Sequence, residues 1–137
     1  MVLPIKHVSV KVIDLDQART FYEEVLGYRH VRTAHTTGLE GDYISCHMTD
    51  GNVDLALEYF GESPDPGAAL EGAPCIDHFG MEVDDIEAFI RKIEAWGGKV
   101  LIRHSATRVK FTVPDLPTME VVQAGRWSKP IAALKMD

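Results

Sequence analysis

The amino-acid sequence predicts an α+β fold built from two βαβββ modules, and three observations support this prediction. First, the stretch from Ile5 to Gly27 is repeated in pattern by the stretch from Ile76 to Gly98, so that residue 78 corresponds to residue 7 at an offset of 71. Second, each copy begins with a period-two pattern and then changes to a helical one. Third, each copy is followed by three more short segments with strand character.

The first segment of each copy is predicted to be a strand with one face on a core, because apolar and polar residues alternate there. The apolar faces consist of Val8, Val10 and Val12 in the first copy and of Phe79, Met81 and Val83 in the second. His7 and His78 fall on the opposite, polar faces of these two strands.

A helix is predicted after each of these strands. Asp14 and Asp85 are suitable N-caps, and Gln17 provides the second half of a capping box for the first helix. Gly27 and the pair Gly97–Gly98 are typical of helix ends. Apolar residues recur at helical spacing in both segments: Leu15, Ala18, Tyr22, Val25 and Leu26, then Ile86, Phe89, Ile90, Ile93 and Trp96.

Three strands are expected after each helix, joined by turn sequences such as "TDGN" and "PDLPT". The expected strands are Tyr28–Ala34, Asp42–Met48 and Val53–Phe60 in the first copy and Lys99–His104, Arg108–Val113 and Met119–Ala124 in the second. The chain is therefore expected to be one domain, residues 1–137. Its parts are module one at about 4–60, a linker at 61–75, module two at about 76–125 and an unassigned tail at 126–137.

Composition limits the classes of partner and compartment. The chain has 137 residues, a net charge of −7 and a pI of about 5.3, which argues against nucleic acid or an anionic membrane as a partner. No apolar run reaches the roughly 20 residues of a membrane span, and the N-terminus lacks the apolar core of a signal peptide. Cys46 and Cys75 have no metal-type spacing and are expected to be free thiols. These features favour a cytoplasmic protein.

Polar residues at matched places suggest a metal site. Each module has a histidine on its first strand and a glutamate on its last strand, namely His7 with Glu58 and His78 with Glu120. All four are expected opposite the face that packs on the helix, where an unpaired buried carboxylate would be costly. Two imidazoles and two carboxylates suit one divalent ion such as nickel, cobalt, zinc, manganese or iron. Such a set leaves coordination positions open for a substrate, which is typical of a catalytic site.

The stretch "HVSVKVIDLDQARTFYEEVLGY" resembles the opening module of the vicinal oxygen chelate superfamily, and the resemblance extends over roughly residues 4–125. That superfamily includes glyoxalase I, methylmalonyl-CoA epimerase, extradiol dioxygenases and drug-resistance proteins. The resemblance implies a cupped mixed sheet around a metal, helices on the outer face, and a homodimer. Its ligand positions correspond here to His7, Glu58, His78 and Glu120. Many members have Asp-Pro-Asp-Gly-Asn before the last ligand, where this chain has "VPDLPTME".

A glutamate at position 58 favours the lyase and isomerase branch of this superfamily over the dioxygenases, which tend to have histidine there. The resemblance then implies removal of a proton next to a carbonyl in a small substrate that chelates the metal through vicinal oxygens. Glu120 and Glu58 are the candidate catalytic residues, since a carboxylate can take and return the proton. Two alternatives are a metal-dependent ring-cleaving dioxygenase and a non-catalytic drug- or metabolite-binding resistance protein.

Further residues are expected to line a substrate pocket. On the third strand of module one, Tyr43, Ser45 and His47 alternate with apolar residues. On the matching strand of module two, Arg108 and Lys110 provide positive charge that could hold an anionic substrate.

Lys11 is also expected in this pocket. Members that bind glutathione have an arginine at the position of Lys11 and an asparagine at that of Glu62. These differences make a glutathione adduct an unexpected substrate, because a lysine lacks the planar fork that arginine offers a carboxylate.

Overall fold

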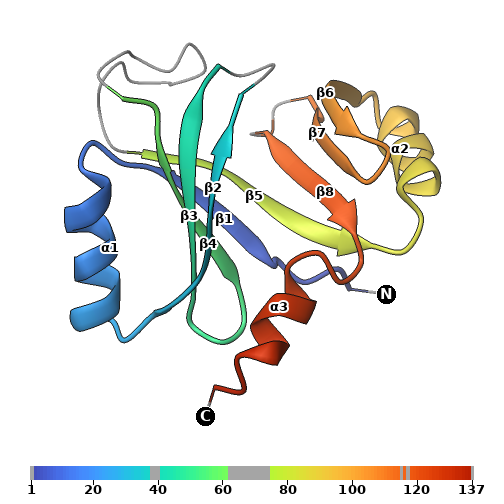
Figure 1. Ribbon diagram of the computed structural model, residues 1–137. Helices are drawn as coiled ribbons and strands as arrows, with labels where there is room; N and C mark the ends of the chain where they lie inside the picture. Colours follow the sequence, from blue (N-terminus) through green and yellow to red (C-terminus); the bar gives the residue numbers. More distant parts are fainter. Residues whose placement is uncertain (1, 38–40, 62–74, 115, 117, 137) are drawn as a thin grey trace.

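The computed structural model describes residues 2–37, 41–61, 75–114, 116 and 118–136, and its central feature is one curved eight-stranded sheet (Figure 1). Module one contains β1 (His7–Lys11), α1 (Leu15–Glu24), β2 (Arg29–Thr36), β3 (Tyr43–Thr49) and β4 (Asp54–Tyr59). Module two contains β5 (Cys75–Val83), α2 (Ile86–Ala95), β6 (Lys99–Ser105), β7 (Arg108–Thr112) and β8 (Met119–Gln123). The predicted fold class is confirmed. The predicted linker lies mostly outside the described residues.

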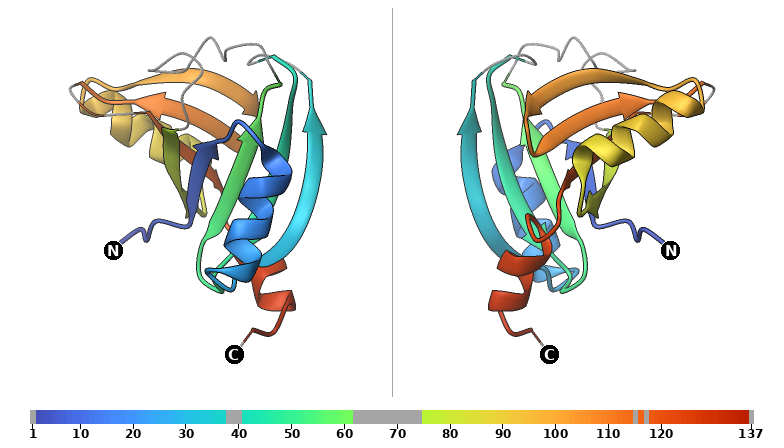
Figure 2. Two further views of the ribbon diagram at one scale, coloured as in Figure 1. Left: turned by 90° about the vertical axis from the view of Figure 1, so that its left-hand side faces the viewer. Right: turned by 90° about the vertical axis from the view of Figure 1, so that its right-hand side faces the viewer.

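The two modules join edge to edge through their first strands. The strand order is β2-β3-β4-β1-β5-β8-β7-β6, in which β1 and β5 are antiparallel neighbours. Each first strand also runs parallel to the last strand of its own module, β1 to β4 and β5 to β8. Both modules of one chain therefore form one sheet, with a pseudo-two-fold relation about the β1–β5 pair. Figure 2 shows the strands of the two modules turning away from each other on either side of this pair.

Both long helices start where the sequence predicts. The Asp14 side chain accepts a hydrogen bond from the backbone N–H of Gln17, and Asp85 accepts one from that of Ala88, each at 3.0 Å. These bonds satisfy N–H groups that a helix cannot satisfy internally. Gly27 and Gly97 have φ angles of 74° and 79°, which favour glycine at a helix end.

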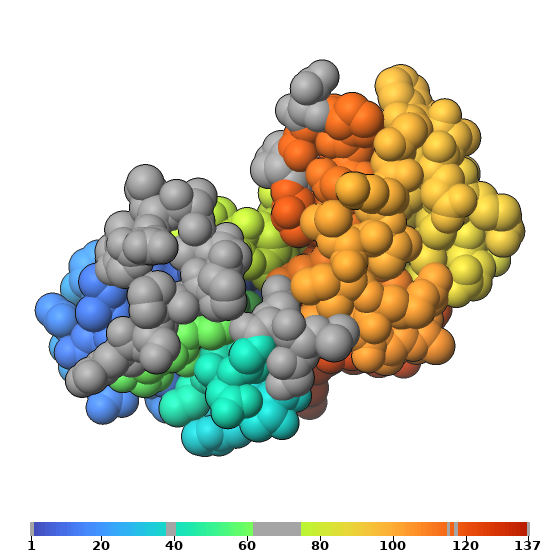
Figure 3. Space-filling view, turned by 90° about the horizontal axis from the view of Figure 1, so that it is seen from above, coloured from blue at the N-terminus to red at the C-terminus, as the bar shows by residue number. Residues whose placement is uncertain are grey.

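The apolar residues form a separate core under each of these two helices. In module one, the buried cluster is Cys46, Met48, Leu55 and Leu57, and the α1 residues Leu15, Ala18 and Tyr22 pack against it. In module two, it consists of Met81, Val83, Ile86, Ile90, Ile93, Val109, Phe111 and Val121. The helices thus cover the outer faces of the strands, and the polar side chains of the same strands face the concave side. The modules appear as two lobes in the space-filling view (Figure 3).

The tail, which the sequence pattern leaves unassigned, contains a third helix. This helix, α3 (Ser128–Ala133), follows β8 and lies near the ends of β1 and β5 (Figure 1). Both cysteines are free, as expected, and Cys46 is buried in the core of module one. None of the helices in the described ranges is long and apolar enough to cross a membrane.

Candidate functional site

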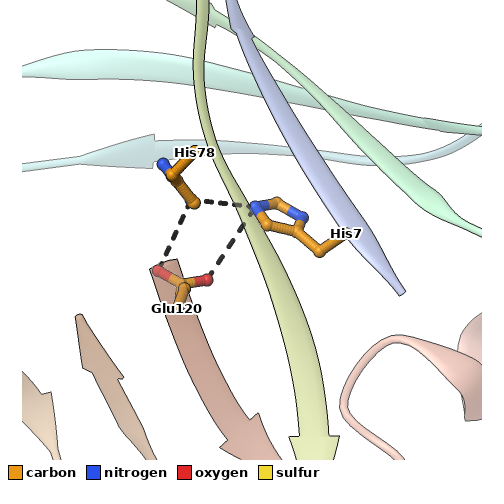
Figure 4. A group of neighbouring side chains, drawn as sticks. All are labelled: His7, His78 and Glu120. Atoms are coloured by element: carbon orange, nitrogen blue, oxygen red, sulfur yellow. Dashed lines mark hydrogen bonds and ion pairs between the residues drawn. The ribbon is translucent and has the colours of Figure 1, made fainter. Parts of the chain in front are cut away.

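Three of the four predicted metal ligands come together on the concave side. His7 of β1, His78 of β5 and Glu120 of β8 are all buried, and their ligand atoms lie within 4.8 Å of one another (Figure 4). The two Nε2 atoms are 3.1 Å apart, and the Glu120 carboxylate oxygens lie 3.8 Å from His7 Nε2 and 3.7 Å from His78 Nε2. Both modules of one chain therefore contribute to one group.

Strand register explains why these side chains meet. His7 lies opposite Gly80 across the antiparallel β1–β5 pair, and Gly80 lies opposite Glu120 across the parallel β5–β8 pair. His78 lies opposite Ser9, two residues along, so the two imidazoles are diagonal neighbours on one face. Gly80, between His7 and Glu120 on β5, contributes no side chain to this face.

Each histidine is held on its far side by an aspartate, the buried Asp54 for His7 and the half-buried Asp77 for His78. His7 Nδ1 donates to Asp54 at 2.7 Å, and His78 Nδ1 donates to Asp77 at 2.6 Å. Burial alone would raise the pKa of both aspartates, but the hydrogen bonds and charges of their histidine neighbours outweigh it and hold each pKa well below its ordinary range. Both carboxylates are therefore ionised acceptors at neutral pH, which leaves the proton of each imidazole on Nδ1.

The chemistry of this donor set fits a divalent cation. When both imidazoles are neutral, with the proton of each on Nδ1, the two Nε2 atoms present lone pairs to each other at 3.1 Å, and the Glu120 carboxylate adds further negative charge. Lone pairs that converge in a buried site repel one another unless a cation lies between them. An imidazole ligand whose other nitrogen donates to a carboxylate is the usual arrangement around a bound metal. His7, His78 and Glu120 are therefore suited to hold one.

The pKa of Glu120 agrees with a role as a ligand. Burial would raise the pKa of this carboxyl, but the charges of His7, Arg108 and His78 lower it below its ordinary value. Arg108 Nε also donates to Glu120 Oε2 at 3.2 Å. Glu120 is thus ionised and oriented at neutral pH.

Glu58 lies one pleat away from this group. Within the repeat, Ser9 of β1 corresponds to Gly80 of β5, and Ser9 lies opposite Ala56 whereas Gly80 lies opposite Glu120. The residue equivalent to Glu120 is therefore Ala56, and Glu58 instead lies opposite Lys11. The two glutamates are not matched in position, contrary to the expectation from the repeat, and Glu58 is not part of the group around His7.

The environment of Glu58 differs from that of Glu120 in its effect on acidity. Burial raises the pKa of Glu58 above its ordinary value, and the nearby Ser9 hydroxyl and the charges of His78 and Lys110 offset this only in part. One carboxyl on the concave side is therefore held as an anion, while the other is shifted toward the protonated form.

A second hydrogen-bonded chain extends from Asp54. His47 Nδ1 donates to Asp54 at 2.9 Å, and the Ser45 hydroxyl donates to His47 Nε2 at 2.8 Å. All three side chains are buried. Asp54 thus accepts from both His7 and His47, so that these two imidazoles share one orienting carboxylate.

A small pocket of about 80 Å³ opens beside the group. The predicted pocket residues Tyr43, Ser45, His47 and Arg108 line it, together with Glu58 and Glu120. Its remaining lining residues are His7, Arg32, Ala34, Thr36, Ala56, Arg126 and Trp127.

Lys11 and Lys110, also predicted for the pocket, lie instead near Asp77, the partner of His78 Nδ1. There Lys11 Nζ contacts Asp77 at 3.0 Å and Lys110 Nζ approaches it at 3.9 Å. Both lysines are buried and face the half-buried Asp77 carboxylate, and neither lines this cavity. Glu62 lies outside the described residues.

The tail closes one side of the site. The Trp127 ring stacks on the His7 imidazole with centroids 4.4 Å apart and planes 8° from parallel. Gly80 makes room for this ring, because a Cβ there would lie 2.7 Å from Trp127 Cη2. The Glu82 carboxylate accepts hydrogen bonds from the backbone N–H groups of Trp127 and Ser128 at 2.8 and 2.9 Å, which anchors the start of α3.

Several residues of the site were missed by sequence reasoning. Asp54 shares the polar face of its strand with Glu58, but only the β1–β4 register shows that it reaches His7. Asp77 directly precedes His78, and this adjacency was a usable signal. Arg126 and Trp127 belong to the tail, which has no repeat counterpart, so the pattern offered no signal for them. Arg32 corresponds to Arg103 at the offset of 71, but sequence pattern alone did not show that β2 reaches the pocket.

Comparisons with known proteins agree with the paired-module architecture. The family model of the Glyoxalase/Bleomycin resistance protein/Dioxygenase superfamily matches residues 4–112. The chain therefore belongs to this superfamily, which confirms the resemblance seen in the sequence.

Relatives by sequence are named as lyases. A probable chloroplastic lactoylglutathione lyase of Arabidopsis thaliana is 26% identical over 95% of this chain and 38% of its own length. A lactoylglutathione lyase of Haemophilus influenzae is 28% identical over 72% of this chain and 71% of its own length. The chain thus spans well under half of the plant relative.

Solved structures share the fold at low sequence identity. Methylmalonyl-CoA epimerase from Mycobacterium tuberculosis superposes with a TM-score of 0.69 at 18% identity, covering 87% of this chain and 86% of that one. The Streptomyces coelicolor epimerase in complex with 2-nitronate-propionyl-CoA gives 0.67 at 16% identity, covering 91% and 99%.

Proposed function

We propose that this protein is a divalent-metal-dependent lyase or isomerase of the glyoxalase type. It removes a proton next to a carbonyl in a small substrate that chelates the metal through vicinal oxygens. The observation that carries the proposal is the pair of Nε2 atoms 3.1 Å apart beside the Glu120 carboxylate, each imidazole held by an aspartate. The names of the sequence relatives support the same reaction class.

His7, His78 and Glu120 are the residues that would hold the ion, which is nickel, cobalt, zinc, manganese or iron by its donor set. When bound, a divalent ion supplies Lewis acidity, which polarises the substrate carbonyl and makes the neighbouring C–H more acidic. Trp127 packs on His7 and limits the access of water from that side.

Glu58 is the proposed base. It lines the pocket next to Glu120, and its raised pKa makes it a stronger proton acceptor than the Glu120 carboxylate, whose pKa is lowered. Glu58 would take the proton from carbon and return it to the neighbouring position. Glu120 acts as a ligand in this proposal, so the two candidate catalytic glutamates have different roles.

One observation favours a second candidate function, a metal-dependent oxygenase. The group that the structure assembles contains two histidines and one carboxylate. This is the facial arrangement used by non-haem iron oxygenases, which leaves three positions open for oxygen and substrate. Glu58 would then line the substrate pocket.

Solvent exchange tests the first proposal. Protein loaded in turn with Ni²⁺, Co²⁺, Zn²⁺, Mn²⁺ or Fe²⁺ is incubated in D₂O with small 2-oxo acids, 2-hydroxy ketones and thioesters, and deuterium at the carbon next to the carbonyl is followed by NMR. We expect metal-dependent exchange that falls by about 10²–10⁴-fold in Glu58→Gln while metal affinity is kept. Glu94→Gln, on the exposed face of α2, is the matched control.

The alternatives give different results in the same preparations. Oxygen uptake by the iron-loaded protein with catecholic substrates, without proton exchange, would support the oxygenase. A chain that binds no divalent ion, and whose ligand affinity is unchanged in Glu120→Ala, would exclude both enzymes and leave a metal-free binding protein.

A further inference from the structure

Three arginines from distant parts of the chain meet at the pocket. Arg32 comes from β2 of module one, Arg108 from β7 of module two, and Arg126 from the turn after β8. Arg108 lies deepest, with a side chain only 20% exposed, whereas Arg32 and Arg126 are exposed at the mouth. The cations thus line a path from solvent to Glu120.

The carboxylates around the pocket do not balance these charges. Glu120 Oε2 accepts a hydrogen bond from Arg108 Nε, and Glu120 also faces His7 and His78. Among the described residues, no carboxylate oxygen lies within ion-pair distance of Arg32 or Arg126. Burial and the charges of Arg108 and Arg32 lower the pKa of Arg126, and the charges of Glu120 and Asp54 offset this only partly. An anion between the three guanidinium groups would relieve this repulsion.

The remaining polar groups keep the deepest arginine in position. Arg108 is oriented through Nε by Glu120 and is hydrogen-bonded to the buried Tyr43. The charge of Glu120 and the bond to Tyr43 raise the pKa of Arg108 against the effect of burial. A guanidinium fixed at one nitrogen still has other N–H groups for an oxyanion, and a planar fork suits a carboxylate or phosphoryl group.

The size of the pocket limits what the anion can belong to. A volume of about 80 Å³ is far below the roughly 300–1,000 Å³ of pockets that enclose a drug-sized ligand. It accommodates a small oxyanion and a few more atoms. The base of the pocket contains His7 and Glu120, so one short molecule can reach the arginines and the candidate metal group together.

We propose that Arg32, Arg108 and Arg126 bind an oxyanionic group of the substrate, so that the substrate is a small acid whose carboxylate or phosphoryl group lies a few bonds from its two chelating oxygens. The inference rests on the proposed function for the identity of the reacting part. It differs from the substrates in the names of the relatives, because a thioester of coenzyme A or a glutathione adduct is much larger than this pocket. The arginines would set both affinity and orientation.

Calorimetric titration tests this directly. Oxalate represents a small carboxylate, phosphoglycolate a small phosphoryl acid, and glycolamide a neutral analogue with two vicinal oxygens. Each is titrated into wild type, Arg32→Gln, Arg126→Gln and the exposed control Arg91→Gln, both metal-free and metal-loaded. Circular dichroism confirms that the variants are folded.

We expect at least one anion to bind metal-free wild type, with affinity that falls about tenfold or more in Arg126→Gln and in Arg32→Gln and stays unchanged in Arg91→Gln. The neutral analogue should bind only in the presence of metal. Which acid binds identifies the carboxylate or the phosphoryl class. Wild-type anion affinity in the Arg32→Gln/Arg126→Gln double variant, or no anion binding at all, would overturn the inference even if metal binds.

The proposed reaction and the proposed anion site can be rejected independently of each other. Arginine-dependent anion binding without proton exchange would leave the anion site in place and reject the lyase or isomerase. Proton exchange on neutral substrates, unaffected by the arginine variants, would keep the reaction and reject the anion site.

Discussion

At the scale of single residues, Asp54 is the side chain on which most of the site depends. It accepts hydrogen bonds from His7 and His47, and both imidazoles line the pocket. Its ionised state keeps the His7 proton on Nδ1 and so leaves Nε2 available to a cation. A substitution of Asp54 therefore affects the candidate metal ligand His7 without removing any of the three ligands.

Asp54→Asn is expected to weaken metal binding by about 10–100-fold, because an amide orients and polarises the His7 imidazole less strongly than a carboxylate does. The affinity is measured by competition with a chromophoric chelator at constant pH. Asp16→Asn, in the exposed first turn of α1, is the control. Unchanged affinity in Asp54→Asn would show that His7 does not need this carboxylate.

At the scale of elements, the helices and strands were predictable and their mutual register was not. The expected strand Arg108–Val113 is observed as β7 at Arg108–Thr112, and the two aspartate caps are confirmed. These features follow from local patterns of a few residues. Contacts across the sheet depend instead on which residue faces which, and a shift of two residues exchanges Ala56 for Glu58 opposite Ser9.

Because local patterns are visible in the sequence and contacts across the sheet are not, only part of the site could be predicted. His7, His78 and Glu120 were found because the repeat marked them, and the structure brings them together. Trp127 lies in the tail, where "GRWSKP" has no counterpart in module one and no clear period. Its place on His7 comes from the anchoring of α3 by Glu82, which is a tertiary contact.

The attachment of α3 is predicted to depend on pH. Burial would raise the pKa of Glu82, but the N–H groups of Ser128 and Trp127 lower it below its ordinary value. A carboxyl whose pKa is lower in the folded state stabilises that state above the pKa of the unfolded chain, and the contribution disappears as pH falls through the folded-state pKa. Acidification through the folded-state pKa of Glu82, which lies below the ordinary value of a glutamate, should therefore release the tail.

Trp127 fluorescence reports this release once the exposed Trp96 is replaced by phenylalanine. We expect a red shift on acidification in Trp96→Phe. Adding Glu82→Ala should give the red-shifted spectrum already at pH 7 and reduce stability by about 1 kcal/mol, the usual contribution of a helix cap. Adding Glu94→Ala instead should change neither. An identical pH profile with and without Glu82 would assign the transition to another group.

At the scale of the whole molecule, the β1–β5 pair places the complete candidate metal group within one chain. The homodimer that the superfamily resemblance implies stays a prediction. If such a dimer forms, it does not need to share ligands between subunits. Each chain should bind one ion at any state of association.

Mixing two defective variants distinguishes the arrangements. His7→Ala and His78→Ala should each bind metal weakly, and their mixture, unfolded and refolded together, should bind no better, as measured by metal content after gel filtration. A site shared between chains would instead regain intact ligand sets in mixed dimers. Recovery of metal binding in the mixture would therefore contradict the single-chain site.

The separation of the two apolar cores has a mechanical consequence. Each core lies under its own helix, and among the described residues none belongs to both. The lobes are joined by the β1–β5 backbone pair, by the polar side chains of the concave face and by the tail, which contacts module one at His7 and Arg29. An ion bound by His7 of module one and by His78 and Glu120 of module two would add a link between the two lobes. Arg32 and Arg108 line the pocket from different lobes, so the spacing of these two cations depends on how firmly the lobes are held together.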